Sequence, residues 1–356
     1  MIVSIIYFIL ILGLIVLVHE FGHFIFAKIF KIHVYEFSIG MGPLVWYSKK
    51  IREKKNKEKK KVSETVYCIR AIPIGGFVQL AGEGADEDKK VKKEALLQSK
   101  PVWQRFLVMF FGAGNNFILA ILILFLSGLI YGSPNLSTKI PYVIEDSPMA
   151  NAGILAGDEI ISINGKNTKT IDDVQLYLTI AGDNETEFKI KRDGVEKTYK
   201  ITPLTGDEKE EKGYGFGFQF NNTMEKGFIK SIKFAFSKSY AIARQVFITI
   251  KELVIGGVSL NQMSGPVGIY TAVDQTRSAG FYSVLNLIAL LSINVGIMNL
   301  IPLPAFDGGR ILFLIIEKIK GKPIKPETEN LIHNIGFYLL IALLLYVTFN
   351  DILRLF

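Results

Sequence analysis

The sequence predicts an α-helical polytopic membrane protein with four transmembrane helices, a membrane-associated β-sheet and an inserted α+β domain. Hydrophobic residues make up 49% of the 356 residues, and the mean hydropathy is +0.32. Four apolar runs are long enough to cross a bilayer, which takes about 20 residues of helix. They occupy residues 2–30, 105–131, 283–304 and 331–350. Between the second and third runs the composition changes to charged, strand-like sequence, which predicts a soluble insertion.

The first apolar run is predicted to be a retained membrane span. A secretory signal peptide would begin with basic residues and end at a small-residue cleavage site. Neither feature is present, and the run continues without a break to His19 and His23. The whole segment 1–132 is therefore interpreted as spans 1 and 2 with a β region, 33–80, between them.

The distribution of positive charge predicts the orientation in the membrane. Lysine and arginine are concentrated at 49–61, at 89–93 and at 310–325, and cytoplasmic loops carry such an excess. The N-terminus, region 132–282 and the C-terminus are then extracytoplasmic. The net charge of +8 is explained by these loops, so nucleic acid is not an expected partner. The single cysteine, Cys68, excludes an internal disulfide.

A candidate metal-binding motif lies at the inner end of the first span. His19-Glu20-Phe21-Gly22-His23 is an H-E-x-x-H sequence. Histidines four residues apart share one face of a helix, so both imidazoles can bind one Zn²⁺, and Glu20 can take a proton from water. Ionisable groups inside a membrane span are functional candidates by default. A pair of core histidines is the alternative until a third ligand is found.

Two alternating segments, 33–48 and 64–80, predict β structure on either side of the lysine-rich segment 49–61, which is expected to be a disordered loop. Gly75 and Gly76 precede the alternating residues 77–80. They predict a turn that presents a strand edge, to which an extended peptide can add as a further strand. An ordinary hairpin explains these residues equally well.

Residues 133–205 are predicted to form the soluble α+β domain. Asn164-Gly165 is a hairpin turn signal, residues 171–180 form a helix pattern, and 188–190 and 198–201 form strand patterns. This arrangement resembles a PDZ domain, which holds peptide C-termini or extended segments against a sheet edge. A spacer domain that binds nothing is the alternative.

The region 206–282 is expected to contain a linker followed by amphipathic helices at the membrane surface. Residues 206–224 are polar and glycine-rich, and 226–255 have apolar residues at helical spacing. Packing of these helices on the protein is an equal alternative. Residues 262–269 are expected to form a turn before span 3. In span 2, Asn115 and Asn116 are interpreted as helix-packing residues among small neighbours.

Region 283–356 contains spans 3 and 4 and a candidate third ligand. Pro302 and Pro304 break the helix of span 3, and Gly308 and Gly309 are expected to allow an irregular backbone after Asp307. Spans 1 and 3 run in the same direction, and His19 lies about 27 Å along span 1. Both sites therefore fall near the cytoplasmic side. Two histidines and one carboxylate form a catalytic zinc arrangement, whereas a helix-capping Asp is the alternative.

Several motifs occur in order along the chain and together resemble one family. They are the H-E-x-x-H sequence, Ile72-Pro73-Ile74-Gly75-Gly76-Phe77-Val78, the PDZ-like core, Ser264-Gly265-Pro266-Val267-Gly268-Ile269, and Asn299-Leu300-Ile301-Pro302-Leu303-Pro304-Ala305-Phe306-Asp307-Gly308-Gly309. The chain resembles the site-2 protease family of intramembrane zinc metalloproteases, peptidase family M50, and within it the RseP-like group. The bacterial members of that group carry a PDZ domain.

The resemblance implies one Zn²⁺ held by His19, His23 and Asp307, with Glu20 as general base. It implies substrate contacts at Asn294 and Asn299. A further implied contact is the β-loop of residues 72–80, with Gly75, Gly76, Phe77 and Val78. The implied location is the bacterial inner membrane, with an extracytoplasmic PDZ domain and the active site near the cytoplasmic side.

The implied function is zinc-dependent regulated intramembrane proteolysis of single-span membrane proteins. Anti-sigma factors and remnant signal peptides are the substrate classes that the resemblance implies. Two other functions are weighed against it. A catalytically inactive PDZ scaffold would not need the intact set of His19, Glu20, His23 and Asp307. A metal transporter can place histidines and acids in a membrane but has no use for a PDZ domain or a β-loop.

Overall fold

The computed structural model describes residues 2–48, 65–83, 91–206, 213–220, 223–257 and 264–354. The chain divides into two compact units, one of residues 1–121 and 263–356 and one of residues 122–262. The lysine-rich segment 49–61, Lys89 and Lys90 lie outside the described residues. The expectation of a disordered loop at 49–61 therefore stays a prediction.

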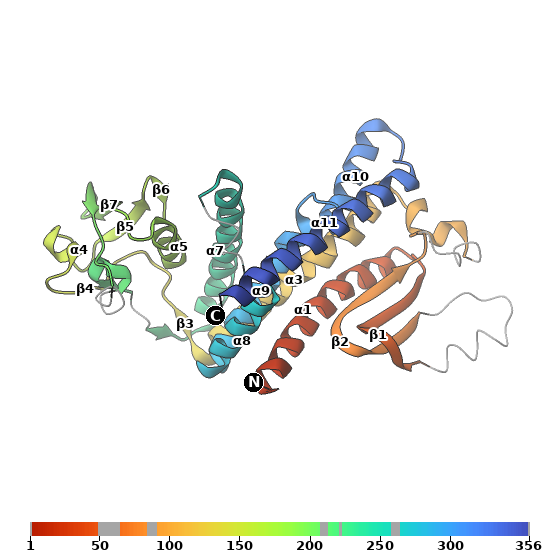
Figure 1. Cartoon of the computed structure of the whole chain (residues 1–356), viewed down its shortest axis with the longest axis horizontal. Helices are drawn as coiled ribbons and strands as arrows, with labels where there is room; N and C mark the ends of the chain where they lie inside the picture. Colours follow the sequence, from red (N-terminus) through yellow and green to blue (C-terminus); the bar gives the residue numbers. More distant parts are fainter. Residues whose placement is uncertain are drawn as a thin grey trace. The chain divides into compact units, whose positions relative to one another are not determined.

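Four long apolar helices confirm the predicted spans by length and composition. They are α1 (Ile2–Ile29), α3 (Val102–Tyr131), α9 (Phe281–Leu300) and α11 (Pro326–Leu353), drawn in Figure 1. Helix α9 is shorter than the apolar run 283–304 because Pro302 cannot continue a helix. Helix α11 begins earlier than its apolar run, since Pro326 is favourable at the first helical position.

The predicted β region is an antiparallel pair of long strands, β1 (Val34–Tyr47) and β2 (Val66–Leu80). Positive φ angles at Gly40, Gly42 and Gly75 (83°, 80° and 82°) bend both strands. As a result each strand contributes two segments to the sheet. Residues 34–39 lie between 66–69 on one side and 76–80 on the other, and 44–47 pair with 68–70.

The bend at Gly75 makes residues 76–80 an edge of this sheet. Within the described residues no strand pairs with the side of 76–80 that faces away from 34–39. Strand β2 contacts helix α1, which lies beside the sheet in Figure 1. The structure therefore has the edge that the sequence predicted, although the turn at 72–75 is a bend within β2.

Two short 3₁₀ turns, η2 (Lys93–Ala95) and η3 (Leu97–Ser99), lead into α3. Helix α8 (Pro266–Ser278) precedes α9, and α10 (Asp307–Lys320) follows it. The expected turn over 262–269 is wrong for residues 266–269, because Pro266 is the first residue of α8. Residues 262 and 263 lie outside the described residues. The buried carboxylate of Asp351 on α11 accepts hydrogen bonds from the N–H groups of Gly265 and Gly268, at 2.8 and 2.9 Å.

The second unit contains the predicted α+β domain. Its antiparallel sheet has the order β6-β5-β7-β8, built from β5 (Glu159–Ile163), β6 (Lys166–Asn167), β7 (Thr186–Arg192) and β8 (Val195–Ile201). Asn164 and Gly165 form the β5–β6 turn with φ of 48° and 73°, as their sequence predicted. Helix α5 (Ile171–Ala181) confirms the predicted helix and begins with a capping box of Thr170 and Asp173.

The expectation of a linker over 206–224 is wrong for residues 213–220. A π-helical turn, η4 (Gly213–Gly217), leads into β9 (Phe218–Gln219), which pairs with β4 (Tyr142–Val143). The side chains of Phe216 and Phe218 are 1% and 2% exposed and pack in the core of the α+β domain. Alternating glycines gave this segment a linker-like composition, but its phenylalanines complete the hydrophobic core.

The remaining elements of this unit include one long helix, α7 (Phe228–Ile255), where amphipathic helices were expected. It contacts α5. Its Arg244 and Lys238 form ion pairs with Asp173 and Asp172 of α5. The alternative of packing on the protein is therefore observed for this face of α7. The small elements α4 (Pro148–Asn151), β3 (Ser133–Pro134) and β10 (Met224–Glu225) complete the unit, and β3 pairs with β10.

An ion pair between a buried aspartate and a partly exposed arginine is expected to make the α+β domain sensitive to acid. Asp158 is 1% exposed and accepts two hydrogen bonds from Arg192, at 2.5 and 2.6 Å, and one from the Leu155 N–H. The Arg192 guanidinium holds the pKa of the Asp158 carboxyl below its usual range, against the opposing effect of burial. A lowered folded-state pKa stabilises the domain above the unfolded pKa of about 3.9, and this stabilisation is lost as pH falls further.

Replacing Asp158 by Asn is expected to destabilise the domain by about 1–2 kcal/mol at pH 7, because a hydrogen-bonded charge is lost. The difference from wild type should shrink as pH is lowered below about 4. Hydrogen exchange of strand β5 in the full chain measures both effects. Glu196→Gln is the control, since Glu196 and Lys189 are 47% and 44% exposed and such pairs contribute little. A pH-independent difference would contradict the assigned role of the charge.

Candidate metal centre

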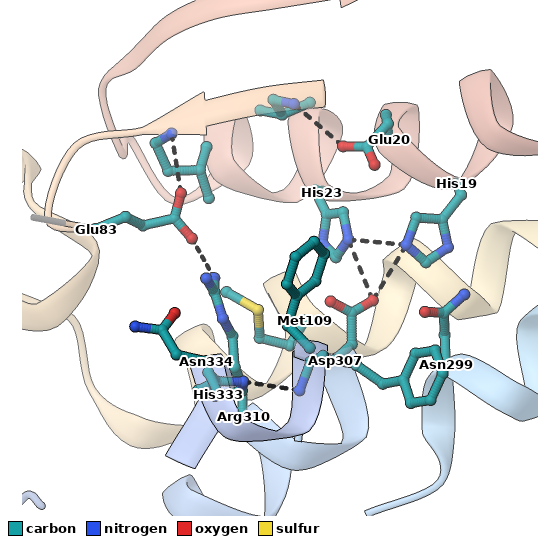
Figure 2. Close-up of a pocket in the computed structure, with 15 residues that line it drawn as sticks. His19, Glu20, His23, Glu83, Met109, Asn299, Asp307, Arg310, His333 and Asn334 are labelled. Atoms are coloured by element: carbon teal, nitrogen blue, oxygen red, sulfur yellow. Dashed lines mark hydrogen bonds and ion pairs between the residues drawn. The ribbon is translucent and has the colours of Figure 1, made fainter. Parts of the chain in front are cut away.

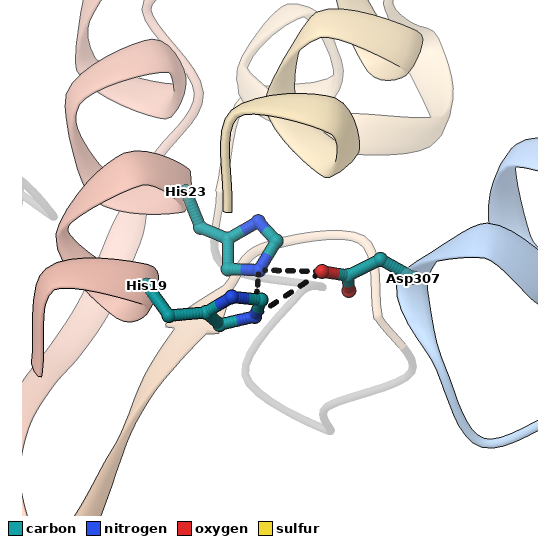
Figure 3. Close-up of side chains that lie close together, drawn as sticks. All are labelled: His19, His23 and Asp307. Atoms are coloured by element: carbon teal, nitrogen blue, oxygen red, sulfur yellow. Dashed lines mark hydrogen bonds and ion pairs between the residues drawn. The ribbon is translucent and has the colours of Figure 1, made fainter. Parts of the chain in front are cut away.

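Helix α1 presents two histidines to one point. His19 and His23 are one turn apart, and each residue is 8% exposed. Their Nε2 atoms lie 3.3 Å apart, and each lies 3.2 Å from Oδ2 of Asp307 at the start of α10 (Figure 3). The three ligand atoms thus meet although Asp307 is almost 300 residues away in the chain. The sequence predicted this set of three residues.

The hydrogen bonding of His23 fixes which nitrogen faces the centre. Its Nδ1 lies 2.8 Å from the carbonyl oxygen of Val108 on α3, and a carbonyl can only accept. Nδ1 therefore carries a proton, and Nε2 is the nitrogen left to bind a metal ion next to Asp307. Such a second partner is typical of a metal-binding histidine, because it orients the ring.

The donor set fits a zinc ion. Ligand atoms at about 2.0–2.2 Å from a tetrahedral ion are about 3.3–3.6 Å apart, close to the observed 3.2–3.3 Å. Asp307 Oδ2 is buried, and lone pairs facing one another without a cation are unfavourable. The described residues contain this one cluster of three His, Cys, Asp or Glu side chains that can hold a metal.

A broken segment between α9 and α10 positions Asp307. Residues 301–306 are not helical, since Pro302 and Pro304 interrupt the backbone hydrogen bonding of a helix. Ala305 has φ of 73°, and its N–H donates to Nδ1 of His333 on α11 at 3.0 Å. His333 therefore holds a strained loop residue two positions before the ligand.

Gly308 and Gly309 have a different role from the one expected. Both are in helix α10 and neither has a positive φ, so the expectation of irregular backbone after Asp307 is wrong. A Cβ at Gly308 would lie 2.2 Å from the Ile301 carbonyl oxygen, and one at Gly309 would lie 2.5 Å from that of Leu303. The two glycines let the loop pack directly on α10. The helix-capping alternative for Asp307 does not apply, because Phe306 is the N-cap.

Two further glycines bring α3 against the centre. A Cβ on Gly22 of α1 would lie 1.9 Å from the Phe111 carbonyl oxygen. A Cβ on Gly112 of α3 would lie 2.3 Å from His23 Nε2 and 3.0 Å from Asp307 Oδ2. Close helix packing through small residues was expected for span 2. Asn116 is fully buried there, and the Asn115 amide is 3.4 Å from the Val18 carbonyl oxygen.

Replacing Gly112 by Ala is expected to displace the His23 ring and lower zinc affinity at least about tenfold, the lower end of losses from disturbed ligand orientation. Zinc content per folded protein, measured after dialysis against a weak chelator, tests this. Gly114→Ala on the same helix is the control, because its Cβ would meet only phenylalanine side chains, at 3.2 Å or more. Equal zinc retention in both variants would show that the ring tolerates the added methyl group.

A cavity of about 470 Å³ opens beside the three candidate ligands. Glu20 lines it, and its Oε2 accepts a hydrogen bond from the Val78 N–H on the β2 edge at 3.1 Å (Figure 2). Three features therefore line one cavity: the candidate metal ligands, a carboxylate that can act as a base, and a strand edge. These are the parts that hydrolysis of an extended peptide needs.

The predicted substrate contacts lie at different distances from this cavity. Asn299 and Val78 line it, whereas Asn294, Gly75, Gly76 and Phe77 do not. Asn294 Oδ1 is buried without a hydrogen-bond partner among the described residues. Gly76 supports the edge indirectly, because a Cβ there would lie 2.6 Å from the Ser38 carbonyl oxygen of the neighbouring strand.

Several residues of the cavity were not singled out by sequence reasoning. They are Glu83, Met109, Arg310, His333, Asn334 and Phe337, most of them labelled in Figure 2. His333 had a usable signal, because it is an ionisable residue inside an apolar run. Glu83 and Arg310 had no such signal, since charged residues are ordinary in segments that flank a membrane span.

Comparison with known proteins agrees with this geometry. Residues 7–343 match the profile of peptidase family M50. The chain is 33% identical to the zinc metalloprotease RasP of Bacillus licheniformis and 31% identical to the regulator of sigma-W protease RasP of Bacillus subtilis. Each comparison covers 99% of both chains. The zinc metalloprotease RasP of Geobacillus kaustophilus is 31% identical over 99% of this chain and 98% of its own. The chain belongs to peptidase family M50.

Proposed function

We propose that this zinc metalloprotease hydrolyses peptide bonds within the transmembrane segments of single-span membrane proteins. The observation that carries the proposal is the placement of the cavity. Its three metal-binding side chains and an edge strand, with which no further strand pairs in the described part of the chain, lie among helices that are long and apolar enough to cross a bilayer. A protease with its site there acts on segments that reach into the membrane.

His19, His23 and Asp307 would hold the zinc ion, leaving one position open. When bound, zinc supplies a Lewis acid that polarises a carbonyl group and acidifies water. Glu20 takes a proton from the water that attacks the scissile carbonyl and delivers it to the departing amine. The net change is the breaking of one C–N bond and the addition of one water molecule.

The edge of β2 can provide hydrogen-bond partners for the backbone of an unwound substrate. A transmembrane helix satisfies its own backbone hydrogen bonds, and once unwound its N–H and C=O groups need partners. Pairing with residues 75–78, at Gly75, Gly76, Phe77 and Val78, supplies them by strand addition. Asn299 and Asn294 on α9 are proposed to help position the same segment, with Asn299 nearest the ligands.

The α+β domain is proposed to be a PDZ domain that restricts which substrates reach the site. A four-stranded antiparallel sheet beside α5 supports this, as does the two-stranded β4–β9 pair. Peptide C-termini or extended segments are its proposed ligands. The lysine-rich loops support an extracytoplasmic domain and an active site near the cytoplasmic side of the bacterial inner membrane.

Anti-sigma factors are the first proposed substrates, because one relative is named a regulator of sigma-W protease. Remnant signal peptides are the second, since they too are single membrane-spanning segments. The two differ in length outside the membrane, which is the property that a filtering PDZ domain would sense.

Cleavage of purified single-span substrates in detergent or liposomes tests the proposal. Wild-type protein is compared with and without a zinc chelator, and mass spectrometry locates the cuts. Cuts inside the span that disappear with the chelator and return with zinc are expected. Bound zinc without cleavage of an anti-sigma segment or a signal peptide would favour a PDZ scaffold. Zinc flux across liposomes without cleavage would favour a transporter.

A further inference from the structure

The outer side of the β2 edge is not free in this structure. The N–H groups of Val78 and Leu80 both point away from the neighbouring strand, as residues two apart in a strand do. Val78 N–H donates to Glu20 at 3.1 Å, and Leu80 N–H donates to Oε2 of Glu83 at 3.3 Å. Two carboxylates therefore occupy the positions that carbonyl oxygens of an added strand would take.

The two carboxylates are held differently. Glu83 uses its other oxygen, Oε1, to accept a hydrogen bond from Nη1 of Arg310 (Figure 2). Among the described residues Glu20 has no such ion pair. The ion pair with Arg310 is an additional charge-assisted bond that holds Glu83 and not Glu20, so an incoming strand displaces Glu20 more readily than Glu83.

Arg310 links Glu83, which accepts from the Leu80 N–H, to the metal centre. It lies three residues after Asp307, in the first turn of α10, and residues three apart are neighbours on a helix surface. The Glu83–Arg310 pair therefore ties the end of the β2 edge to the helix that carries a metal ligand. Its side chains are 25% and 42% exposed, so its effect on overall stability is small.

The number of outward N–H groups on the β2 edge determines how many registers a paired substrate strand can adopt. An extended substrate can slide along a strand edge by two residues and still present the same side chains to the same face. Each such slide places a different peptide bond at the metal centre. An edge whose outward donors include both Val78 and Leu80 permits one more register than an edge that ends at Val78.

We propose that Glu83, held by Arg310, ends the substrate-pairing edge after Val78 and thereby sets the register in which substrate lies against the metal centre. This inference rests on the proposed function. Glu83 and Arg310 are specificity-determining and positioning residues, and they take no part in the proton transfers.

The test maps the cut sites of full-length protein on one single-span substrate by mass spectrometry. Wild type is expected to give one main cut. Glu83→Ala should raise a second cut, two residues away, at least about fivefold, the ratio that one backbone hydrogen bond supports. Arg310→Met, which releases Glu83, should do the same to a smaller extent. Glu94→Ala, at an exposed residue of η2, is the control and should leave the pattern unchanged.

Glu83→Gln separates the hydrogen bond with Leu80 N–H from the ion pair with Arg310. Its amide oxygen can still accept from Leu80 N–H, so one main cut should persist. A swap of Glu83→Arg with Arg310→Glu restores the ion pair but puts a donor beside the Leu80 N–H, so two cuts should appear. One main cut in the swap would show that the ion pair alone sets the register and would overturn the proposal.

A second measurement reads the register without catalysis. Gln79→Cys is made with Glu20→Gln and Cys68→Ser, and disulfides are formed with a substrate carrying cysteine at successive positions. One reactive substrate position is expected with Glu83 present and two, spaced by two residues, with Glu83→Ala. Identical patterns would overturn the inference, as would loss of all cleavage in Glu83→Ala with zinc retained. Absence of cleavage by the wild-type protein would instead refute the proposed function. The proposed role of Glu83 in setting the register would then fall with it.

Discussion

Replacing Glu20 by Gln is expected to lower the rate of peptide cleavage by about 10²–10⁴-fold, the usual contribution of a general base, while the protein keeps its zinc. Gln has nearly the same size as Glu, and its amide oxygen can still accept the hydrogen bond from Val78 N–H. The strand edge and the cavity should therefore stay intact. What is lost is the ability to take a proton from water.

Three measurements on purified protein check this result: zinc content, melting temperature, and cleavage of a single-span substrate. Glu94→Gln makes the same chemical change at an exposed site outside the cavity and should leave cleavage unchanged. Cleavage by Glu20→Gln at the wild-type rate would remove Glu20 from the proton-transfer role. Loss of zinc in this variant would show that Glu20 supports the metal centre instead.

The parts of the fold that the sequence predicted are those with a strong local signal. The four apolar runs predicted α1, α3, α9 and α11 because a membrane span is recognisable from length and hydropathy alone. Asn164-Gly165 predicted its turn, since few residue pairs adopt two positive φ angles. Such signals are local and do not depend on what the segment later contacts.

Sequence reasoning failed in two glycine-containing segments, where the role of a residue depends on what it packs against. Phe216 and Phe218 lie in a glycine-rich segment, and only the rest of the α+β domain shows that they are core residues. Gly308 and Gly309 indicated backbone freedom, yet the structure uses them for close approach to carbonyl oxygens of the preceding loop. Glycine supplies either property, and the sequence does not distinguish between them.

The candidate site divides in the same way. His19 and His23 were predicted from their spacing, and Asp307 was predicted because its depth matched theirs. Glu83 and Arg310 are more than 200 residues apart and meet only because the end of β2 lies beside the start of α10. The catalytic set of a membrane protease is thus more visible in sequence than the residues that position its substrate.

Replacing Asp307 by Asn is expected to weaken zinc binding by at least about 100-fold, more than the 10–100-fold loss that follows removal of a partner outside the coordination sphere. Asn keeps the volume of the side chain, so α10 and the loop before it should be unchanged. The amide has no negative charge and is a poorer ligand than a carboxylate. Two imidazoles alone would then hold the ion, with cleavage lost in parallel.

Zinc competition with a chromogenic chelator measures the affinity of the purified variant. Asp351→Asn is a matched control, since Asp351 is also a buried carboxylate of the first unit, but it accepts backbone hydrogen bonds at the start of α8. That variant should melt at a lower temperature yet bind zinc as wild type does. Undiminished zinc affinity in Asp307→Asn would remove Asp307 from the ligand set. Cleavage that returns with excess zinc would show that Asp307 acts through the metal rather than on the substrate.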